Sequence, residues 1–178
     1  MSKPTPNATE LLPPTILIVD DDPDIVLVLH DLLEHVGYRV LDAGTGADAL
    51  AKTKTTSPSA VLLDVMLPDM DGLSVLALLK QLDPMLPVII LTAFVEVAKK
   101  HASLTEGAFG YVTKPYDAEE LKALIRRAVG VKHLSIEAAA AKQALTASED
   151  RFREVVQTAP DAIVLADGEG RMLSWNSA

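Results

Sequence analysis

The stretch ILIVDDDPDI, residues 16–25, joins four apolar residues to three consecutive aspartates. The apolar residues have the length and composition of a buried strand, and Pro23 suits the first turn of a helix that follows. Apolar runs of strand length then alternate with segments of helical periodicity, in five strand–helix pairs. Such alternation, with continuous apolar strands, predicts a doubly wound α/β domain with a five-stranded parallel sheet. The predicted strands are TILIVD (15–20), YRVLDA (38–43), AVLLDV (60–65), PVIILTA (87–93) and GYVT (110–113).

The predicted helices follow these strands in turn. The first begins at Pro23 with Asp22 as its N-cap, and Gly37 is its stop signal. The further predicted helices cover residues 47–54, 72–82, 95–107 and 117–129. The inward face of the first helix is formed by Ile25, Leu29, Leu32, Leu33 and Val36.

Composition and charge limit the classes of function that fit this chain. Its 178 residues are 49% hydrophobic, which is enough for the core of a globular domain. Twenty-five acidic and sixteen basic residues give a net charge of −9, which argues against a nucleic-acid or anionic-membrane surface. Residues 1–14 are polar and proline-rich, and we expect them to be a flexible N-terminus rather than a signal peptide. With no cysteine and no apolar window of membrane-spanning length, we expect a cytoplasmic protein without a membrane partner.

Polar side chains follow four of the predicted strands where each strand ends. Asp20 and Asp21 follow the first strand, Asp64 ends the third, Thr92 ends the fourth and Lys114 follows the fifth. Because the carboxyl ends of parallel strands meet at one edge of the sheet, these residues should converge on one crevice. Neighbouring carboxylates raise one another's pKa unless a cation compensates them, and Mg²⁺ is the oxygen-seeking cation that suits them. Asp64 can then act as a nucleophile toward a phosphoryl group whose oxygens contact Lys114 and Thr92.

Four ordered motifs carry a resemblance that covers residues 15–130. VDDD, LLDVMLPDMDG, LTA and YVTKP, in this order and spacing, resemble the receiver domain of two-component response regulators. The resemblance implies that a sensor histidine kinase or a phosphotransfer protein passes a phosphoryl group from its phosphohistidine to an aspartate of this chain, with Mg²⁺ as cofactor. No helix-turn-helix follows the motifs, so we expect no nucleic-acid partner.

Carried over residue by residue, the resemblance implies a role for each matching position. Asp64 is the implied phosphoacceptor, and Thr92 and Lys114 are the implied phosphate contacts. The peptide bond between Lys114 and Pro115 is implied to be cis. The other implied residues are the metal ligands Asp20 (through water), Asp21, Asp64 and the Met66 backbone carbonyl, and the switch residues Thr92 and Tyr111.

Three other interpretations of the same residues stay open. DDDPD resembles the Asp-x-Asp motif of haloacid-dehalogenase-like phosphatases, with Asp20 as nucleophile and Asp22 as acid, although Asp24 stands where such enzymes have Thr or Val. GTGADA, residues 44–49, has the form of a dinucleotide-binding fingerprint but follows the second strand rather than the first. The chain could also be an interaction module that keeps the fold and signals without phosphorylation.

Beyond residue 130 the sequence changes character. Residues 131–157 predict a helical linker, and residues 148–178 resemble the opening of a PAS sensory domain, so we expect 158–178 to be the truncated start of that domain, with a hairpin. Gly130 could instead end the helix. A heptad counted from Leu121 as position a predicts a weak parallel coiled coil and a homodimer through this helix. Its d positions are Leu124, Val131, Ala138, Leu145 and Phe152, and its a positions are Leu121, Ala128, Ser135, Lys142, Glu149 and Val156.

Overall fold

The computed structural model describes residues 13–93, 107–158, 164–169 and 171–175. The chain divides into two units, residues 1–133 and 134–178, and each is treated by itself. Most of the predicted N-terminal segment 1–14 and all but the last residue of the predicted helix 95–107 lie outside the described residues.

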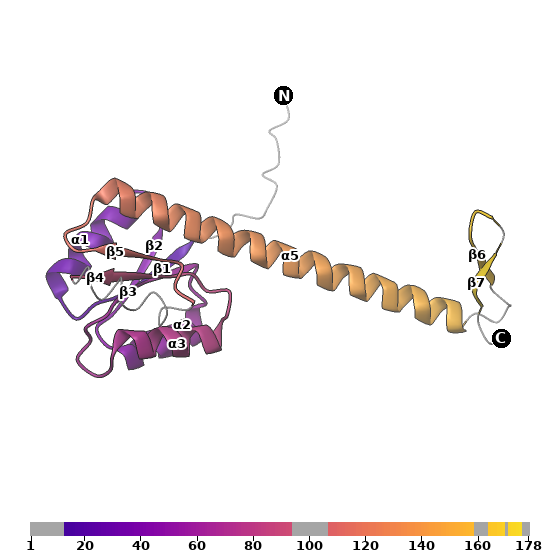
Figure 1. The fold of residues 1–178 in the computed structure, drawn as a ribbon, viewed down its shortest axis with the longest axis horizontal. Coiled ribbons are helices and arrows are strands. Elements are labelled where there is room, and N and C mark those ends of the chain that lie inside the picture. Colours follow the sequence, from indigo (N-terminus) through magenta and orange to yellow (C-terminus); the bar gives the residue numbers. More distant parts are fainter. Residues whose placement is uncertain (1–12, 94–106, 159–163, 170, 176–178) are drawn as a thin grey trace, which may run out of the picture. The chain divides into compact units, whose positions relative to one another are not determined.

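The first unit is built on a five-stranded parallel sheet, as the alternating pattern predicted (Figure 1). The strand order is β2-β1-β3-β4-β5, so the chain first moves outward from β1 to one side and then crosses back to the other. Each strand lies within one or two residues of its predicted bounds. The strands are β1 (Thr15–Val19), β2 (Arg39–Ala43), β3 (Ala60–Asp64), β4 (Val88–Thr92) and β5 (Gly110–Thr113).

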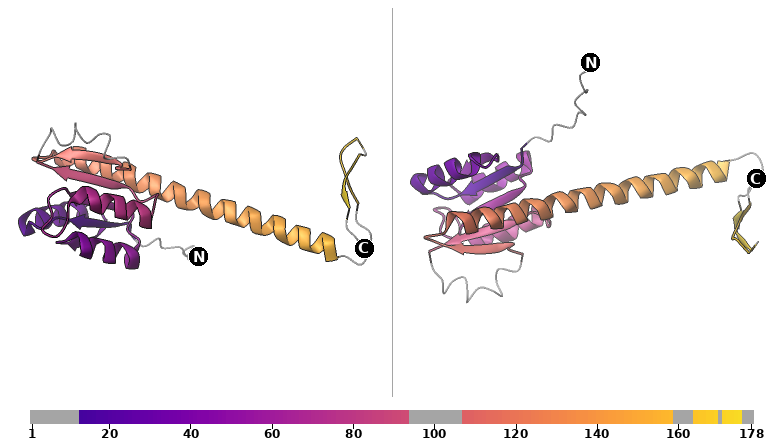
Figure 2. Two further views of the ribbon diagram at one scale, coloured as in Figure 1. Left: turned by 60° about the horizontal axis from the view of Figure 1, so that its bottom comes forward. Right: turned by 90° about the horizontal axis from the view of Figure 1, so that it is seen from above.

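Helices cover both faces of this sheet (Figure 2). The first turns of α5 and the buried face of α1 pack on one side of the strands, and α2 and α3 pack on the other. This arrangement explains why the strand sequences are apolar on both faces rather than alternating with polar residues. The described helices are α1 (Pro23–Glu34), α2 (Gly46–Thr56), α3 (Gly72–Leu82) and α5 (Ala118–Thr158).

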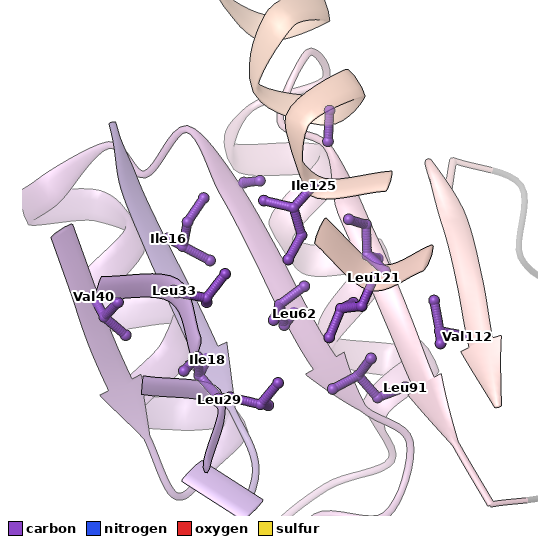
Figure 3. Packing of buried hydrophobic residues seen from close by; sticks show 13 residues of the cluster. Ile16, Ile18, Leu29, Leu33, Val40, Leu62, Leu91, Val112, Leu121 and Ile125 are labelled. Atoms are coloured by element: carbon purple, nitrogen blue, oxygen red, sulfur yellow. The ribbon is translucent and has the colours of Figure 1, made fainter. Parts of the chain in front are cut away.

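The core consists of two layers that meet in the sheet. Neighbouring residues of one strand serve opposite layers, because side chains alternate across a strand: Ile16 and Ile18 face α1 and α5, whereas Leu17 and Val19 face α2 and α3. All four side chains are fully buried. Figure 3 shows the first layer, in which Leu121 and Ile125 of α5 pack over the central strands.

The ends of α1 confirm two sequence predictions and correct a third. Asp22 is the N-cap, and its side chain accepts a hydrogen bond from the Asp24 N–H at 2.9 Å. Gly37 follows the helix with a φ of +89°, a conformation that favours glycine. Val36 does not belong to the buried face, because the helix ends at Glu34 and the side chain is 45% exposed.

The second unit contains the rest of α5 and a two-stranded antiparallel hairpin. Strand β6 (Val164–Ala166) pairs with β7 (Met172–Trp175), where the sequence predicted a hairpin. Asp167 organises the turn, since its carboxylate accepts hydrogen bonds from the backbone N–H groups of Glu169 and Arg171. Gly130 does not end α5, which continues unbroken to Thr158. In the described ranges, none of the helices has the length and hydropathy that crossing a bilayer requires.

Gly72, the first residue of α3, lets this helix approach the end of β3 closely. A Cβ atom at this position would lie 2.3 Å from the backbone oxygen of Asp64 and 2.7 Å from the Cα of Val65. Both are backbone atoms, so the clash cannot be relieved by a side-chain rotation. We expect Gly72→Ala to lower the free energy of unfolding by about 1–3 kcal/mol, measured by urea denaturation.

Gly130 provides the matched control for this prediction. It lies inside α5, and a Cβ atom there meets nothing within 4 Å. Gly130→Ala should therefore raise stability by about 1 kcal/mol, the difference in helix propensity between the two residues. Equal unfolding midpoints for the two variants would contradict the close approach at Gly72.

Candidate functional site

The site lies where the strand order reverses. Strands β2 and β3 flank β1 on its two sides, so the connections after β1 and β3 leave the sheet toward opposite faces and open a crevice at their carboxyl ends. Asp20 directly follows β1, and Asp64 is the last residue of β3. Both carboxylates therefore stand at the place in this fold where ligands bind.

Lys114 joins the two carboxylates. Its ammonium Nζ lies 2.7 Å from Oδ2 of Asp20 and 2.6 Å from Oδ2 of Asp64, and it donates a hydrogen bond to each. The side chains of Asp20, Asp64 and Lys114 are only 1%, 14% and 17% exposed. The ammonium of Lys114 thus lies between two carboxylates that are 44 residues apart in sequence. The sequence predicted this convergence from the common edge at which the parallel strands end.

Backbone N–H groups hold the other oxygen of each carboxylate. Oδ1 of Asp20 accepts from the Asp22 N–H at 3.0 Å, and Oδ1 of Asp64 accepts from the Met66 N–H at 3.1 Å. In both cases the donor is two residues further along, in the turn by which the chain leaves its strand. Each carboxylate is therefore fixed on one side by its own loop and on the other side by Lys114.

The charges at the site are not fully balanced. Burial raises the pKa of the Asp20 carboxyl above 3.8, because it opposes ionisation more strongly than Lys114 and the Asp22 N–H favour it. Burial also disfavours the charged form of Lys114, yet its pKa is raised above 10.5 because hydrogen bonds and charges from Asp20 and Asp64 outweigh burial. Charged partners thus outweigh burial at Lys114 but not at Asp20. Lys114 has two anionic partners, whereas Asp20 shares its one cationic partner with Asp64.

The other predicted residues lie around this centre at different depths. Thr92 ends β4 and is buried, and its backbone oxygen accepts the Lys114 N–H at 2.7 Å, which links the end of β4 to the lysine. The peptide bond between Lys114 and Pro115 is cis, as expected. The predicted switch residue Tyr111 is half exposed on β5 and is not part of the buried centre.

Asp21 and Met66 lie at the rim of the site. Asp21 is exposed and, with Asp20, lines a pocket of about 460 Å³ that α1 and the end of β2 complete. Met66 has an exposed side chain and meets Asp64 through its backbone. Over the part of the chain that the structure describes, no three His, Cys, Asp or Glu side chains are grouped closely enough to hold a metal ion. Of the three predicted carboxylates, Asp20 and Asp64 therefore meet at Lys114, whereas Asp21 lies outside this pair.

Tyr116 is a site neighbour that the sequence analysis missed. It is partly buried against the core, and burial raises the pKa of its hydroxyl, while the charges of Lys114 and Asp20 also act on it. Its position in the sequence, two residues after Lys114, could have indicated that it lies near the site.

Asp69 explains the glycine-rich stretch 44–49. Its carboxylate accepts hydrogen bonds from the backbone N–H groups of Gly46 at 2.9 Å and Ala47 at 3.0 Å, and these bonds hold its pKa below 3.8. The N-terminus of α2, where a dinucleotide phosphate would bind, is therefore filled by the chain's own anion. The same contacts attach the loop after Asp64 to the start of α2. The glycine-rich stretch therefore has a structural role here, and not a role in binding a dinucleotide.

Comparison with known proteins identifies the family. The family model described as "Response regulator receiver domain" matches residues 16–126. The chain belongs to this family. It contains a receiver domain of two-component response regulators, and the phosphatase and interaction-module interpretations are not favoured.

Individual relatives agree with this identification. The chain is 44% identical over 119 residues to the probable transcriptional regulatory protein TcrX of Mycobacterium tuberculosis, covering 65% of this chain and 51% of TcrX. It is 39% identical over 114 residues to the DNA-binding transcriptional regulator NtrC of Escherichia coli, covering 64% of this chain and 24% of NtrC. It thus spans about half of TcrX and a quarter of NtrC.

A solved structure shows the same receiver fold. The signal receiver domain of an HD domain-containing protein from Pseudomonas fluorescens superposes with a TM-score of 0.67 at 30% identity, covering 75% of this chain and 98% of that one. The match thus takes in nearly the whole of a chain crystallised as a receiver domain.

The raised pKa of Asp20 fixes the direction in which pH acts on the metal-free receiver. Above pH 3.8 the unfolded chain ionises Asp20, whereas the folded chain keeps the proton to a higher pH, so the contribution of Asp20 to the free energy of unfolding falls as pH rises between these two pKa values. Asp20→Asn removes this contribution while nearly keeping the shape of the side chain. We expect the variant to melt above the wild type at neutral pH, with a gain that shrinks toward pH 3.8.

The measurement is thermal unfolding between acid and neutral pH in the presence of a chelator. Asp22→Asn is the control, because asparagine also caps helices and the residue lies outside the lysine pair. An Asp20→Asn gain that grows toward acid, or a variant less stable than the wild type at neutral pH, would contradict the imbalance of charge at Asp20.

Proposed function

We propose that Asp64 is the phosphoacceptor of this receiver domain. The observation that carries the proposal is the pair of contacts by which Lys114 holds Asp64 beside Asp20 at the switch point of the sheet. In the proposed reaction a carboxylate oxygen of Asp64 attacks the phosphorus of a partner's phosphohistidine. An oxygen–phosphorus bond forms, the phosphorus–nitrogen bond breaks, and the imidazole nitrogen leaves with the electron pair and takes a proton.

Lys114 and Thr92 are the proposed phosphate contacts. An ammonium that lies 2.6 Å from Asp64 can stay paired with the phosphoryl group that this carboxylate receives. Thr92 ends the neighbouring strand, one residue beyond Leu91, which pairs with Asp64 in the register of the sheet. Its hydroxyl is the group on β4 best placed to donate to a phosphoryl oxygen.

A magnesium ion fits the donor set at this site. The available groups are all oxygens, and the two carboxylates of Asp20 and Asp64 share the single ammonium of Lys114. We assign the ion to Asp21 directly, Asp20 through water, Asp64 and the Met66 backbone carbonyl. When bound, magnesium neutralises charge on a transferring phosphoryl group.

Thr92 and Tyr111 are the proposed switch. A phosphoryl group on Asp64 would draw the Thr92 hydroxyl toward it and bias β4 and β5 toward a second arrangement. Tyr111 lies on β5 with half of its surface exposed, so its side chain is not fixed in the core.

The proposed partner is a sensor histidine kinase or a phosphotransfer protein. DNA binding is named for NtrC, of which this chain matches 24%. For this chain, the net charge of −9 supports an output without nucleic acid. We also propose that the protein is cytoplasmic, because its sequence has no cysteine and no apolar window of membrane-spanning length.

We propose the domain order that the sequence suggested. Residues 15–130 form the receiver, 131–157 a helical linker that joins two copies of the chain, and 158–178 the start of a PAS domain. The antiparallel pairing of β6 and β7 supports a PAS hairpin, and two strands need further strands to form a stable sheet. A coding sequence that continues into an unrelated fold would contradict the PAS assignment.

The phosphoacceptor is tested by labelling with a small acyl phosphate and Mg²⁺. We expect the wild type to gain one phosphoryl group by intact mass, labile in acid and in base as an acyl phosphate is, and Asp64→Asn to gain none, because the amide removes the nucleophile and nearly keeps the shape. Asp22→Asn, an adjacent change that leaves the cap in place, should be labelled like the wild type. Undiminished labelling of Asp64→Asn would overturn the assignment.

The coupling from the site to β5 is tested with Thr92→Ala. We expect beryllofluoride, a phosphoryl mimic, to shift the backbone amide signals of Gly107 to Tyr116 in the wild type, and to shift them several-fold less in the variant, while Asp64 still binds the mimic. Equal shifts in both proteins would show that Thr92 does not carry the signal.

A further inference from the structure

The exposed face of α5 carries one continuous apolar stripe. Beyond residue 130, the exposed large apolar side chains of this helix are 46–65% exposed, and all but Ile136 lie on this stripe: Val131, Leu134, Ile136, Leu145, Phe152 and Val155. Together with three smaller residues between them, the side chains on the stripe are spaced alternately three and four residues apart, which is the spacing of the a and d positions of a heptad. The whole stripe, called the seam below, is Val131, Leu134, Ala138, Ala141, Leu145, Ser148, Phe152 and Val155, all exposed and all apolar except Ser148.

The seam differs from the heptad counted from Leu121 in one of its two columns. One column, Val131, Ala138, Leu145 and Phe152, is the same in both assignments. The second column lies one residue earlier than expected, at Leu134, Ala141, Ser148 and Val155 in place of Ser135, Lys142, Glu149 and Val156. One residue is about 100° around a helix, so the seam's second column exposes apolar side chains where the earlier one had two charges.

Charges beside the seam favour one orientation of a partner helix. With Val131 at position a, Glu137 is at g and Lys142 is at the e position of the next heptad. In a parallel pair of identical helices, g of one copy faces the following e of the other, so Glu137 meets Lys142 of the second copy twice. The next such pair, Ala144 with Glu149, brings no like charges together. Val131 at a and Leu134 at d also form the combination that favours two strands.

We propose that residues 131–155 of two copies of this chain pair along the seam as a parallel, in-register coiled coil. This inference rests on the homodimer proposed above, keeps the parallel direction that the sequence predicted, and adds the face and the register. Alanines at the centre and Ser148 make the pairing weak, so association responds to what happens at either end of the helix.

Single cysteines test the register, because the chain contains none. Ala141→Cys and Ser148→Cys put a thiol at two levels of the seam, and Ala140→Cys and Ala147→Cys put it one residue away as matched controls. Under mild oxidation the seam variants should form dimers linked by a disulfide several-fold more completely than the controls. In an antiparallel pair, at most one position along the helix can face the same position of the second copy. Disulfide linkage at both seam positions therefore requires parallel helices.

The possible failures of the register and of the dimer are distinguishable. A monomer of the full chain in sedimentation at tens of micromolar would overturn the proposed dimer and with it the seam pairing. A dimer that links through Lys142→Cys and Glu149→Cys in preference to the seam variants would overturn the register alone.

The direction has its own test in a charge exchange. Glu137→Lys should weaken the dimer about three- to tenfold, and adding Lys142→Glu should restore the affinity. No recovery in the double variant would contradict the parallel orientation.

Discussion

One ammonium group, that of Lys114, holds together the two carboxylates on which the site is built. Asp20 and Asp64 come from different strands and are nearly buried, and without a cation between them their ionised forms would repel in a medium that screens charge poorly. The lysine reaches them because it directly follows β5, the edge strand beside β4, and its backbone N–H donates a hydrogen bond to the Thr92 carbonyl at the end of β4. The order of the strands is therefore also what assembles the charges.

This arrangement leaves the site with more anions than cations, which suits its function. Asp20 and Asp64 share the one ammonium of Lys114, so a second positive charge would be favoured beside them. Magnesium and a phosphoryl group together bring charge of both signs to the same crevice. A site that was fully neutral in the free protein would have less to gain from either.

The sequence was informative wherever the local pattern and the fold agree. The bounds of α3 and β5 could be predicted to the residue, because breakers or turn residues flank strongly apolar segments. The convergence of Asp64 and Lys114 followed from the parallel sheet alone. What could not be predicted depended on contacts between distant segments: Asp69 reaching the N-terminus of α2, and Val36 falling outside α1.

The most direct test of this account is the pKa of Lys114 in the metal-free receiver, measured by NMR titration of its side-chain carbon signals. The account predicts a pKa above 10.5, because two carboxylates outweigh the cost of burying the ammonium, and a lower value when Asp64 is replaced by Asn. A pKa at or below 10.5 in the wild type would mean that the lysine is not held by the two carboxylates, and would contradict the account.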